Sequence, residues 1–319
     1  MVQSSSLSAI HHASEYQQRQ WLPCQHSLSC ADPDAQCDIS VQPGSSSPSP
    51  DISYLVPREQ GEEVSGSTLT SQCATGISAI SDIDHLVGSL KADATFLLVV
   101  DKALKNCKGR AFQLGKMLQL FHSSVTDDRE VLLQDYLEAW KELIKFMDSM
   151  GTVFTFISHE TISKINILQN YLNGENGRSY QTVRSMIKYE LDNGVVNFKE
   201  LPPNRVPSGC RTLLRIHRAL KWLEVFLYNL GTNPGQAKTS DMCAAAYHET
   251  LAHHHSWFIR QVAEVAFLAL PPVEDMYKVI CVRDHAEAKV VLMTTVDTIV
   301  KVYNLTQELY TTNHMLDLP

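Results

Sequence analysis

The sequence predicts an all-α domain that follows a polar N-terminal extension. Beyond position 81, apolar residues recur at three- and four-residue spacing nearly throughout, as on the buried side of a helix. No stretch alternates apolar and polar residues as a half-buried strand would. Glycine and proline interrupt the pattern at intervals that suit helix ends. These observations favour a helical fold over a sheet or a mixed one.

The first 80 residues differ in composition from the rest of the chain. They contain no lysine, two arginines and eight acidic residues, and serine occupies twelve of the first fifty positions. Such a stretch cannot bury enough apolar surface to offset the entropy lost on ordering. We therefore predict a disordered, acidic, Ser-rich tail over 1–80, an extra helix or linker over 81–110, and the folded domain over 111–319.

Helical periodicity and its interruptions place the elements in order. The expected helices cover 82–106, 112–124, 130–150, 159–173, 178–193, 209–231, 239–254, 256–269, 272–281 and 284–313. Gly151 ends the third of these helices, and the glycine-rich segment 173–177 ends the fourth. The loop 201–209 contains three prolines that no helix tolerates, so it separates the fifth helix from the sixth. A turn at 232–235 and the pair Pro271-Pro272 mark two later boundaries.

Charge and cysteine usage narrow the class of protein. The chain carries a formal charge of −8, most of it in the tail, so the domain lacks the broad basic surface of a nucleic-acid binder. No secretion signal is evident at the start, and the strongly apolar run Phe96–Val100 is too short to span a bilayer. We therefore expect a cytosolic protein whose eight cysteines are free thiols. Without a CxxC pair, a structural zinc site has little support.

The 209–231 segment carries the most informative pattern. Arg211, Arg215, Arg218 and Trp222 follow one another at i, i+4, i+7 and i+11, and so share one side of a helix that is otherwise strongly apolar. Aligned guanidinium groups repel one another unless an anion lies beside them, and their paired N–H donors match phosphate oxygens. Spacing alone leaves open ordinary salt bridges to acidic residues on neighbouring helices.

Two further clusters hold polar side chains. Glu160 and Lys164 stand four residues apart on a helix that we expect to follow an N-cap at Ser158, and a plain surface ion pair is the alternative. The segment 252–257 reads Ala-His-His-His-Ser-Trp. Consecutive helical residues point about 100° apart, so the three imidazoles cannot share one metal ion. A single hydrogen-bonding histidine beside an exposed tryptophan is the favoured interpretation.

No motif for catalysis accompanies these clusters. The sequence has no GxSxG or HExxH motif, and no glycine-rich phosphate-binding loop between a strand and a helix. We expect no catalytic residue, no metal and no cofactor.

Several segments, in the right order, resemble the glycolipid transfer protein superfamily, and within it the ceramide-1-phosphate transfer type. The segments are Tyr136–Phe146, Gly151–Ile157, Ser208–Leu220, Val302–Tyr310 and the ending Leu316–Pro319, and the likeness runs from about Phe112 to Pro319. The resemblance implies a two-layer helical sandwich in which the lipid tails slip between layers while the headgroup stays at the surface. A divergent paralogue that contains the same domain is the alternative within the superfamily.

The resemblance also assigns roles to individual residues. It gives Lys164, Arg211 and Arg215 to the lipid phosphate, His255 to the ceramide amide carbonyl, and Glu160 to the amide N–H and hydroxyl. Arg215 stands where sugar-binding members have a tryptophan, and a guanidinium suits a phosphate better than a neutral sugar. Glu160 departs from the family's usual Asp, which moves the carboxylate one methylene further from the backbone.

The implied function is transfer of one phosphosphingolipid, ceramide 1-phosphate or a close relative, by a monomer that catalyses no reaction. Trp257 is expected to make reversible peripheral contact with the membrane surface. The candidates for the apolar pocket are Phe146, Phe154, Leu168, Leu214 and Phe226. The alternatives are a lipid sensor or scaffold with the same pocket, a carrier of neutral glycosphingolipids, and a helical interaction protein without a ligand.

Overall fold

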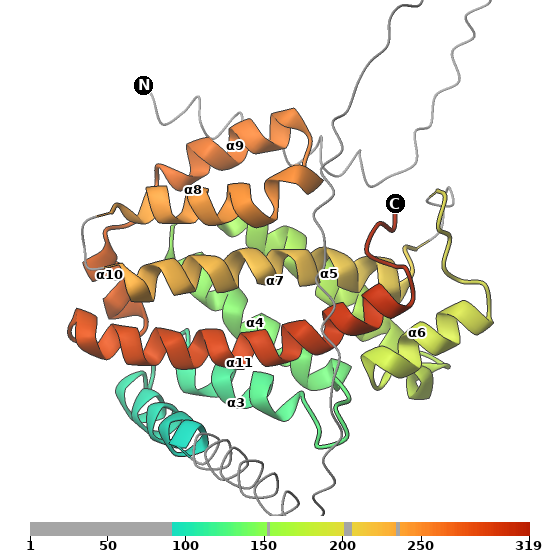
Figure 1. Ribbon diagram of the computed structural model, residues 1–319, viewed down its shortest axis with the longest axis horizontal. Coiled ribbons are helices and arrows are strands. Elements are labelled where there is room, and N and C mark those ends of the chain that lie inside the picture. Colours follow the sequence, from blue (N-terminus) through green and yellow to red (C-terminus); the bar gives the residue numbers. More distant parts are fainter. Residues whose placement is uncertain (1–90, 152–153, 201–205, 234–236) are drawn as a thin grey trace, which may run out of the picture. The chain divides into compact units, whose positions relative to one another are not determined.

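Helices dominate the part of the chain that the computed structural model describes, which is residues 91–151, 154–200, 206–233 and 237–319 (Figure 1). They are a helix over 91–106, α3 (Leu114–Ser123), α4 (Leu133–Ser149), α5 (Phe154–Asn173), α6 (Val183–Asp192), α7 (Gly209–Thr232), α8 (Thr239–Thr250), α9 (Trp257–Phe267), α10 (Val273–Val279) and α11 (His285–Thr312). Two 3-10 turns, η1 (Gly177–Tyr180) and η2 (Ala252–His254), precede α6 and α9. Within these ranges, β structure is limited to isolated bridges, so the predicted all-α class is confirmed.

The helices lie in two layers that meet at α7. In Figure 1, α11, α7 and α8 run beside one another, and α4 and α5 run behind them. α7 packs against α11 and α8 within its own layer and against α5 in the other. Its residues Leu213, Leu220 and Phe226 are fully buried, which explains why the 209–231 segment is apolar on more than one side. Some polar residues of α7, such as Thr212 and His217, are therefore buried along with the apolar ones.

Hydrogen bonds from distant residues fix the beginning of α7. Ser208 is the N-cap, and its hydroxyl accepts from the backbone N–H of Arg211. The buried carboxylate of Glu190, on α6, accepts from the N–H groups of Gly209 at 2.6 Å and Cys210 at 2.9 Å. These bonds satisfy helix N–H groups that otherwise have no acceptor, and they set the position of the first turn.

The beginning of α5 differs from the prediction. Ser158 does not cap this helix, because α5 begins at Phe154 and Ser158 is buried within it. The φ of Gly151 is 119°, which ends the helical path after α4. Phe154, whose ring is fully buried, is the first residue of α5. The predicted N-cap at Ser158 therefore placed the beginning of α5 about one turn too late. The expected 239–254 helix also divides, since α8 ends at Thr250 before η2.

The helix over 91–106 packs on the domain from outside the region of family likeness. Val99, Val100 and Ala103 are buried, and Phe96 stacks on His122 of α3 with ring centroids 4.6 Å apart. Lys102 pairs with Glu287 of α11 at 2.5 Å. The predicted tail over 1–80 and residues 81–90 of the predicted extra helix or linker lie outside the described residues, so those boundaries remain predictions.

A disulfide corrects the prediction that every cysteine is a free thiol. It joins Cys107, which follows the 91–106 helix, to Cys281, which lies between α10 and α11, with Cα atoms 5.7 Å apart. The two residues are 174 positions apart, and only the packing of the outer helix on this corner brings them together. The positions of the two cysteines in the sequence do not predict this contact. Cys210 and Cys243 are free and buried, as expected.

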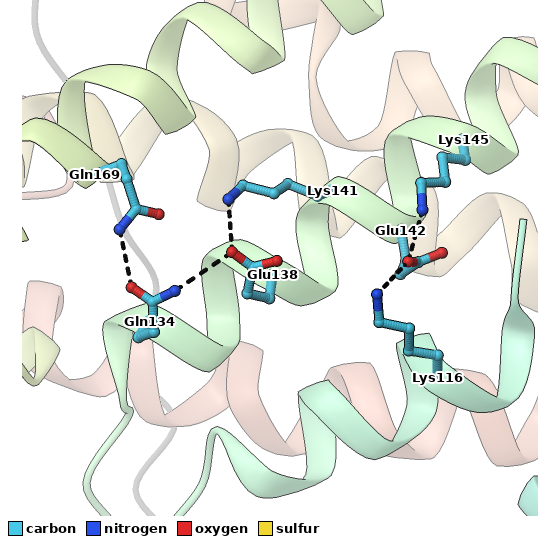
Figure 2. Close-up of polar contacts among 7 residues, drawn as sticks. All are labelled: Lys116, Gln134, Glu138, Lys141, Glu142, Lys145 and Gln169. Carbon is cyan, nitrogen blue, oxygen red and sulfur yellow. Dashed lines mark hydrogen bonds and ion pairs between the residues drawn. The ribbon is translucent and has the colours of Figure 1, made fainter. Parts of the chain in front are cut away.

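A polar network ties α3 to α4 on their shared side (Figure 2). The buried carboxylate of Glu142 accepts from Lys116 of α3 at 2.8 Å and from Lys145 at 2.7 Å. Burial raises the pKa of Glu142, but the two lysines outweigh it, so that the pKa is lowered overall. Figure 2 also shows Gln169 of α5 bonded to Gln134 of α4.

No helix among the described residues combines the length and apolarity needed to cross a bilayer.

Candidate functional site

A cavity of about 200 Å³ lies between α5, α7, α8 and α9. One set of lining side chains is apolar and consists of Phe156, Ile157, Ile216, Ala219, Trp222, Leu251, Ile259, Val262, Ala263, Ala266 and Phe267. The other set is polar or charged and consists of Glu160, Thr161, Lys164, Arg215, Arg218, Tyr247, His254 and His255. The cavity therefore suits a ligand that has a long apolar part and an anionic part.

The structure brings most of the predicted headgroup residues to this one cavity. Glu160, Lys164, Arg215 and His255 all line it, although they come from α5, α7 and the segment after η2. Arg211 is not among the lining residues, but it lies one turn before Arg215 on α7 and donates a hydrogen bond to the same acceptor, the main-chain oxygen of Pro319. Trp257 lies two residues beyond His255, at the first position of α9, and is 67% exposed.

The five pocket candidates occupy other positions. Phe146, Phe154, Leu168, Leu214 and Phe226 are all buried in the core, and none of them is among the residues that line the cavity. Their apolar spacing identified buried positions correctly. It could not distinguish a side chain packed against a neighbouring helix from one that faces an internal space.

Glu160 and Lys164 form a pair within the cavity wall. Lys164 Nζ lies 2.8 Å from Glu160 Oε2, and the side chains are only 16% and 21% exposed. Sequence spacing left open a plain surface pair of this kind. The low exposure excludes that alternative, because both charges are largely withdrawn from water.

The three arginines of α7 donate hydrogen bonds to main-chain oxygens near the end of the sequence. Arg215 donates to the carbonyl of Leu318 at 3.0 Å and to the main-chain oxygen of Pro319 at 2.6 Å. Arg211 also donates to Pro319, and Arg218 donates to Leu316. Burial, together with the charges of Arg211 and Arg218, lowers the pKa of Arg215 to about 9. Burial lowers the pKa of Arg211 to about 10, with Arg218 adding to the effect. The cluster is thus a desolvated, mutually repelling group of cations that an anion would stabilise.

His255 is neutral in this environment. Burial, followed by the charges of Arg218 and Arg260, lowers its pKa to about 4. Its Nδ1 lies 2.8 Å from the hydroxyl of Tyr247 on α8. With Tyr247 as the donor, the imidazole proton resides on Nε2, which is the tautomer that offers an N–H to a ligand.

Sequence reasoning missed several polar contributors to the cavity, among them Arg218 and Tyr247. Arg218 belonged to the recognised arginine stripe but received no role of its own. No sequence pattern identified Tyr247, because its contact with His255 joins α8 to the segment after η2. Among the described residues, no three His, Cys, Asp or Glu side chains cluster closely enough to hold a metal ion.

Layered helices around a cavity that is apolar on one part of its wall and cationic on another define a class of protein that binds amphiphilic ligands. The family described as Glycolipid transfer protein (GLTP) matches residues 131–282. The ceramide-1-phosphate transfer protein of Danio rerio is 47% identical over 209 residues, which are 66% of this chain and 99% of that relative. The human ceramide-1-phosphate transfer protein is 38% identical over 208 residues, 65% of this chain and 97% of the relative. The chain belongs to the glycolipid transfer protein family.

Solved structures agree with this assignment. Human ceramide-1-phosphate transfer protein in complex with 2:0 ceramide-1-phosphate has a TM-score of 0.63 and 38% identity, and the match covers 65% of this chain and 99% of that one. The apo-form of mouse ceramide-1-phosphate transfer protein has a TM-score of 0.61 and 39% identity, with 64% and 98% covered. The two-layer helical sandwich expected from the resemblance is confirmed.

Acid should destabilise the folded protein through three histidines whose pKa values are lowered by full or partial burial. Burial lowers the pKa values of His217, His254 and His255 from 6.5 to about 4. As the pH falls below 6.5, the unfolded chain takes up protons that the folded protein does not bind until about pH 4. The free energy of unfolding, measured by urea denaturation, should therefore decrease as the pH falls through this window. Above pH 6.5, the three histidines should have little effect on it.

The variant His217→Gln isolates one of these groups. His217 is buried on α7 and bonds Gln307 at 2.7 Å, so the variant should show a shallower pH dependence than the wild type. His159→Gln, at an exposed position of α5, is the matched control. An unchanged slope in His217→Gln would contradict the assignment.

Proposed function

We propose that this protein binds one phosphosphingolipid of the ceramide 1-phosphate kind and carries it between membranes. The observation that supports this most strongly is the cavity wall, where Lys164, Arg215 and Arg218 accompany a large apolar surface. Relatives named ceramide-1-phosphate transfer proteins support the same ligand, as does the solved human complex with 2:0 ceramide-1-phosphate.

The phosphate is held by Lys164, Arg211 and Arg215 in this proposal. Burial lowers the pKa values of the two arginines and the positive charges of neighbouring arginines add to the effect, so negative charge beside them is favourable. A phosphate supplies that charge, and its oxygens accept paired hydrogen bonds from a guanidinium. A neutral sugar headgroup would leave the repulsion between the arginines in place. Headgroup selection thus follows from electrostatics on α7.

The ceramide amide lies between His255 and Glu160. The Nε2–H of His255 donates to the amide carbonyl, while the carboxylate of Glu160 accepts from the amide N–H and the hydroxyl. Glu160 already bonds Lys164 at 2.8 Å, so one lysine can serve the carboxylate and the phosphate together.

The lipid tails provide most of the binding free energy. Each methylene withdrawn from water contributes roughly 0.8 kcal/mol, so two long chains outweigh any single headgroup contact. The apolar part of the wall, with Trp222 and Phe267, is where these chains enter. No step of this function makes or breaks a covalent bond, and the protein acts as a carrier and not as an enzyme.

Membrane contact occurs through α9. Trp257 at its beginning is exposed, as are Val265 and Leu268 near its end. A tryptophan ring favours the interface between water and lipid, and a few exposed apolar groups bind weakly enough to permit release. We propose that the protein works as a monomer in the cytosol and visits membrane surfaces transiently.

Removing the charge of Arg215 should impair transfer of the phosphorylated lipid. A hydrogen bond to a charged group contributes about 1.5–3 kcal/mol, so Arg215→Gln should slow vesicle-to-vesicle transfer of ceramide 1-phosphate by at least about tenfold. The assay measures fluorescently labelled lipid leaving donor vesicles. Arg110→Gln, an exposed arginine outside the cavity, is the matched control.

Three results of this assay would count against the proposal. Equal transfer rates for Arg215→Gln and the wild type would contradict the role of Arg215 in binding the lipid phosphate. Transfer of galactosylceramide but not of ceramide 1-phosphate would assign the protein to neutral lipids. Tight binding of ceramide 1-phosphate without transfer would make the protein a sensor.

Trp257 should affect docking more than lipid recognition. Trp257→Ala should reduce binding to phosphatidylcholine vesicles by roughly tenfold, since burying a large apolar side chain contributes about 1.5–3 kcal/mol. Binding of short-chain ceramide 1-phosphate in solution should stay unchanged. Leu97→Ala removes an equally exposed apolar side chain from the 91–106 helix and is the control. Vesicle binding that survives in Trp257→Ala but falls in Leu97→Ala would place docking elsewhere.

A further inference from the structure

The helix over 91–106 has apolar residues on two sides. Its inner side packs on the domain through Val99, Val100 and Ala103, which are buried. On the outer side, the neighbouring residues Leu97 and Leu98 are 65% and 69% exposed. Single exposed leucines are common on protein surfaces, but two adjacent ones on a helix whose other side already packs in the core form an apolar patch. Withdrawing this patch from water takes a partner outside the described domain.

Lysines extend the same side of the helix beyond the two leucines. Lys91, Leu98 and Lys105 follow one another at seven-residue spacing, which places them on a common side, two turns apart. Both lysines are exposed. Lys105 contacts Asp101 at 2.6 Å, but the two side chains are 73% and 61% exposed. A pair so open to water contributes little, so Lys105 can exchange this carboxylate for another anion.

Positive charge is concentrated in this part of the chain. Residues 91–110 contain five bases and two acids, whereas residues 111–319 contain 20 bases and 23 acids. The five bases are all exposed and are Lys91, Lys102, Lys105, Lys108 and Arg110. A basic segment that also exposes apolar side chains has the character of a helix that lies on the surface of an anionic bilayer.

A bilayer suits this surface better than a protein partner does. Stable protein interfaces bury about 800 Å² on each partner and require matching shapes, which two leucines on one turn of a helix cannot supply. A bilayer adapts to the helix without a matching shape. Long lysine side chains can keep their ammonium groups among the lipid headgroups while neighbouring leucines enter the boundary with the acyl chains.

This surface is separate from the one that carries Trp257. The 91–106 helix packs on α3, where Phe96 stacks on His122, and the Cys107–Cys281 disulfide joins its end to the corner between α10 and α11. In Figure 1, α3 lies toward the bottom of the domain and α9 at the top. Lipid contact through the 91–106 helix is therefore independent of lipid contact through α9.

We propose that Lys91, Leu97, Leu98 and Lys105 form a second membrane-contact surface, which binds bilayers that contain anionic phospholipid. The leucines enter the interface, and the lysines contact the phosphate and carboxylate groups of the lipids. The four residues lie outside the region of family likeness, which begins at about Phe112. This chain thus selects membranes by their charge, through residues that take no part in holding the transported lipid.

The test compares binding of the full-length protein to two kinds of vesicle by co-sedimentation. One kind is phosphatidylcholine alone, and the other also contains phosphatidylserine. The wild type should bind the second kind at least about tenfold more tightly at low salt, and the gain should shrink as salt is added. The double variant Lys91→Gln, Lys105→Gln should lose at least about tenfold in affinity for the phosphatidylserine vesicles. Its binding to phosphatidylcholine alone should be unchanged.

A second double variant tests the apolar part of the surface. Leu97→Ser with Leu98→Ser should also remove most of the gain that phosphatidylserine gives, because attraction between charges alone leaves the helix above the lipid. Both residues are exposed, so the inner side of the helix stays packed. Circular dichroism and unchanged binding of short-chain ceramide 1-phosphate establish that each variant is folded and retains its cavity.

Matched controls remove the same kinds of group elsewhere. Arg129→Gln with Lys188→Gln deletes two exposed bases, whose side chains are 69% and 77% exposed and lie outside the 91–110 segment. Tyr228→Ser removes a half-exposed apolar side chain from α7. Both controls should keep the wild-type gain from phosphatidylserine.

Four outcomes would overturn the inference. They are no gain from phosphatidylserine in the wild type, an equal loss in the control that removes two bases, and loss of the whole gain in Trp257→Ala, which would assign anionic lipid to α9. The fourth is a dimer in lipid-free solution that the Leu97→Ser, Leu98→Ser variant converts to a monomer, because the leucines would then contact a second copy. None of these results measures transport of ceramide 1-phosphate, so the proposed function is tested separately.

Discussion

Repulsion between like charges on a buried helix is the constraint on which the site depends. Arg211, Arg215 and Arg218 project from one side of α7, a helix whose remaining sides pack against α5, α8 and α11. Such charges are costly to withdraw from water unless they gain partners. The carboxylate of Glu190 holds the first turn of α7, and main-chain oxygens of Leu316, Leu318 and Pro319 accept hydrogen bonds from the arginines. The fold therefore holds three cations beside one another, which is an arrangement that suits a phosphate.

Headgroup selection and overall affinity arise from different parts of the same cavity. The apolar wall attracts any lipid with long chains, because burial of methylene groups is not specific. The polar residues add little to that attraction but penalise a ligand that leaves them without partners. Neutral His255, with its Nδ1 bonded to Tyr247, contributes a directed donor and no additional charge. In the proposed function, residues of α7, α5 and the segment after η2 therefore discriminate between phosphorylated and neutral sphingolipids.

Sequence patterns predicted the features that depend on local spacing. The arginine stripe, the Glu160–Lys164 pair and the all-α class each follow from three- and four-residue periodicity, and the structure contains all of them. Features that depend on packing between distant segments escaped prediction. The Cys107–Cys281 disulfide, the Tyr247–His255 bond and the carbonyls that meet the arginines belong to this group. Every residue type has a main-chain oxygen, so the order of side chains in a sequence does not show which of these oxygens accepts a hydrogen bond. The N-cap assigned to Ser158 failed for a related reason, since the burial of Phe154 outweighed a local capping preference.

The most direct test of this account is the identity of the lipid that the protein retains. Mass spectrometry of the lipids that co-purify with the full-length chain, expressed in cells that synthesise sphingolipids, makes no assumption about the ligand. The arrangement of Lys164, Arg211 and Arg215 predicts a phosphorylated sphingolipid, and its depletion in Arg215→Gln. Recovery of neutral glycosylceramides alone, in both the wild type and the variant, would contradict the claim that the positive charge on α7 selects the headgroup.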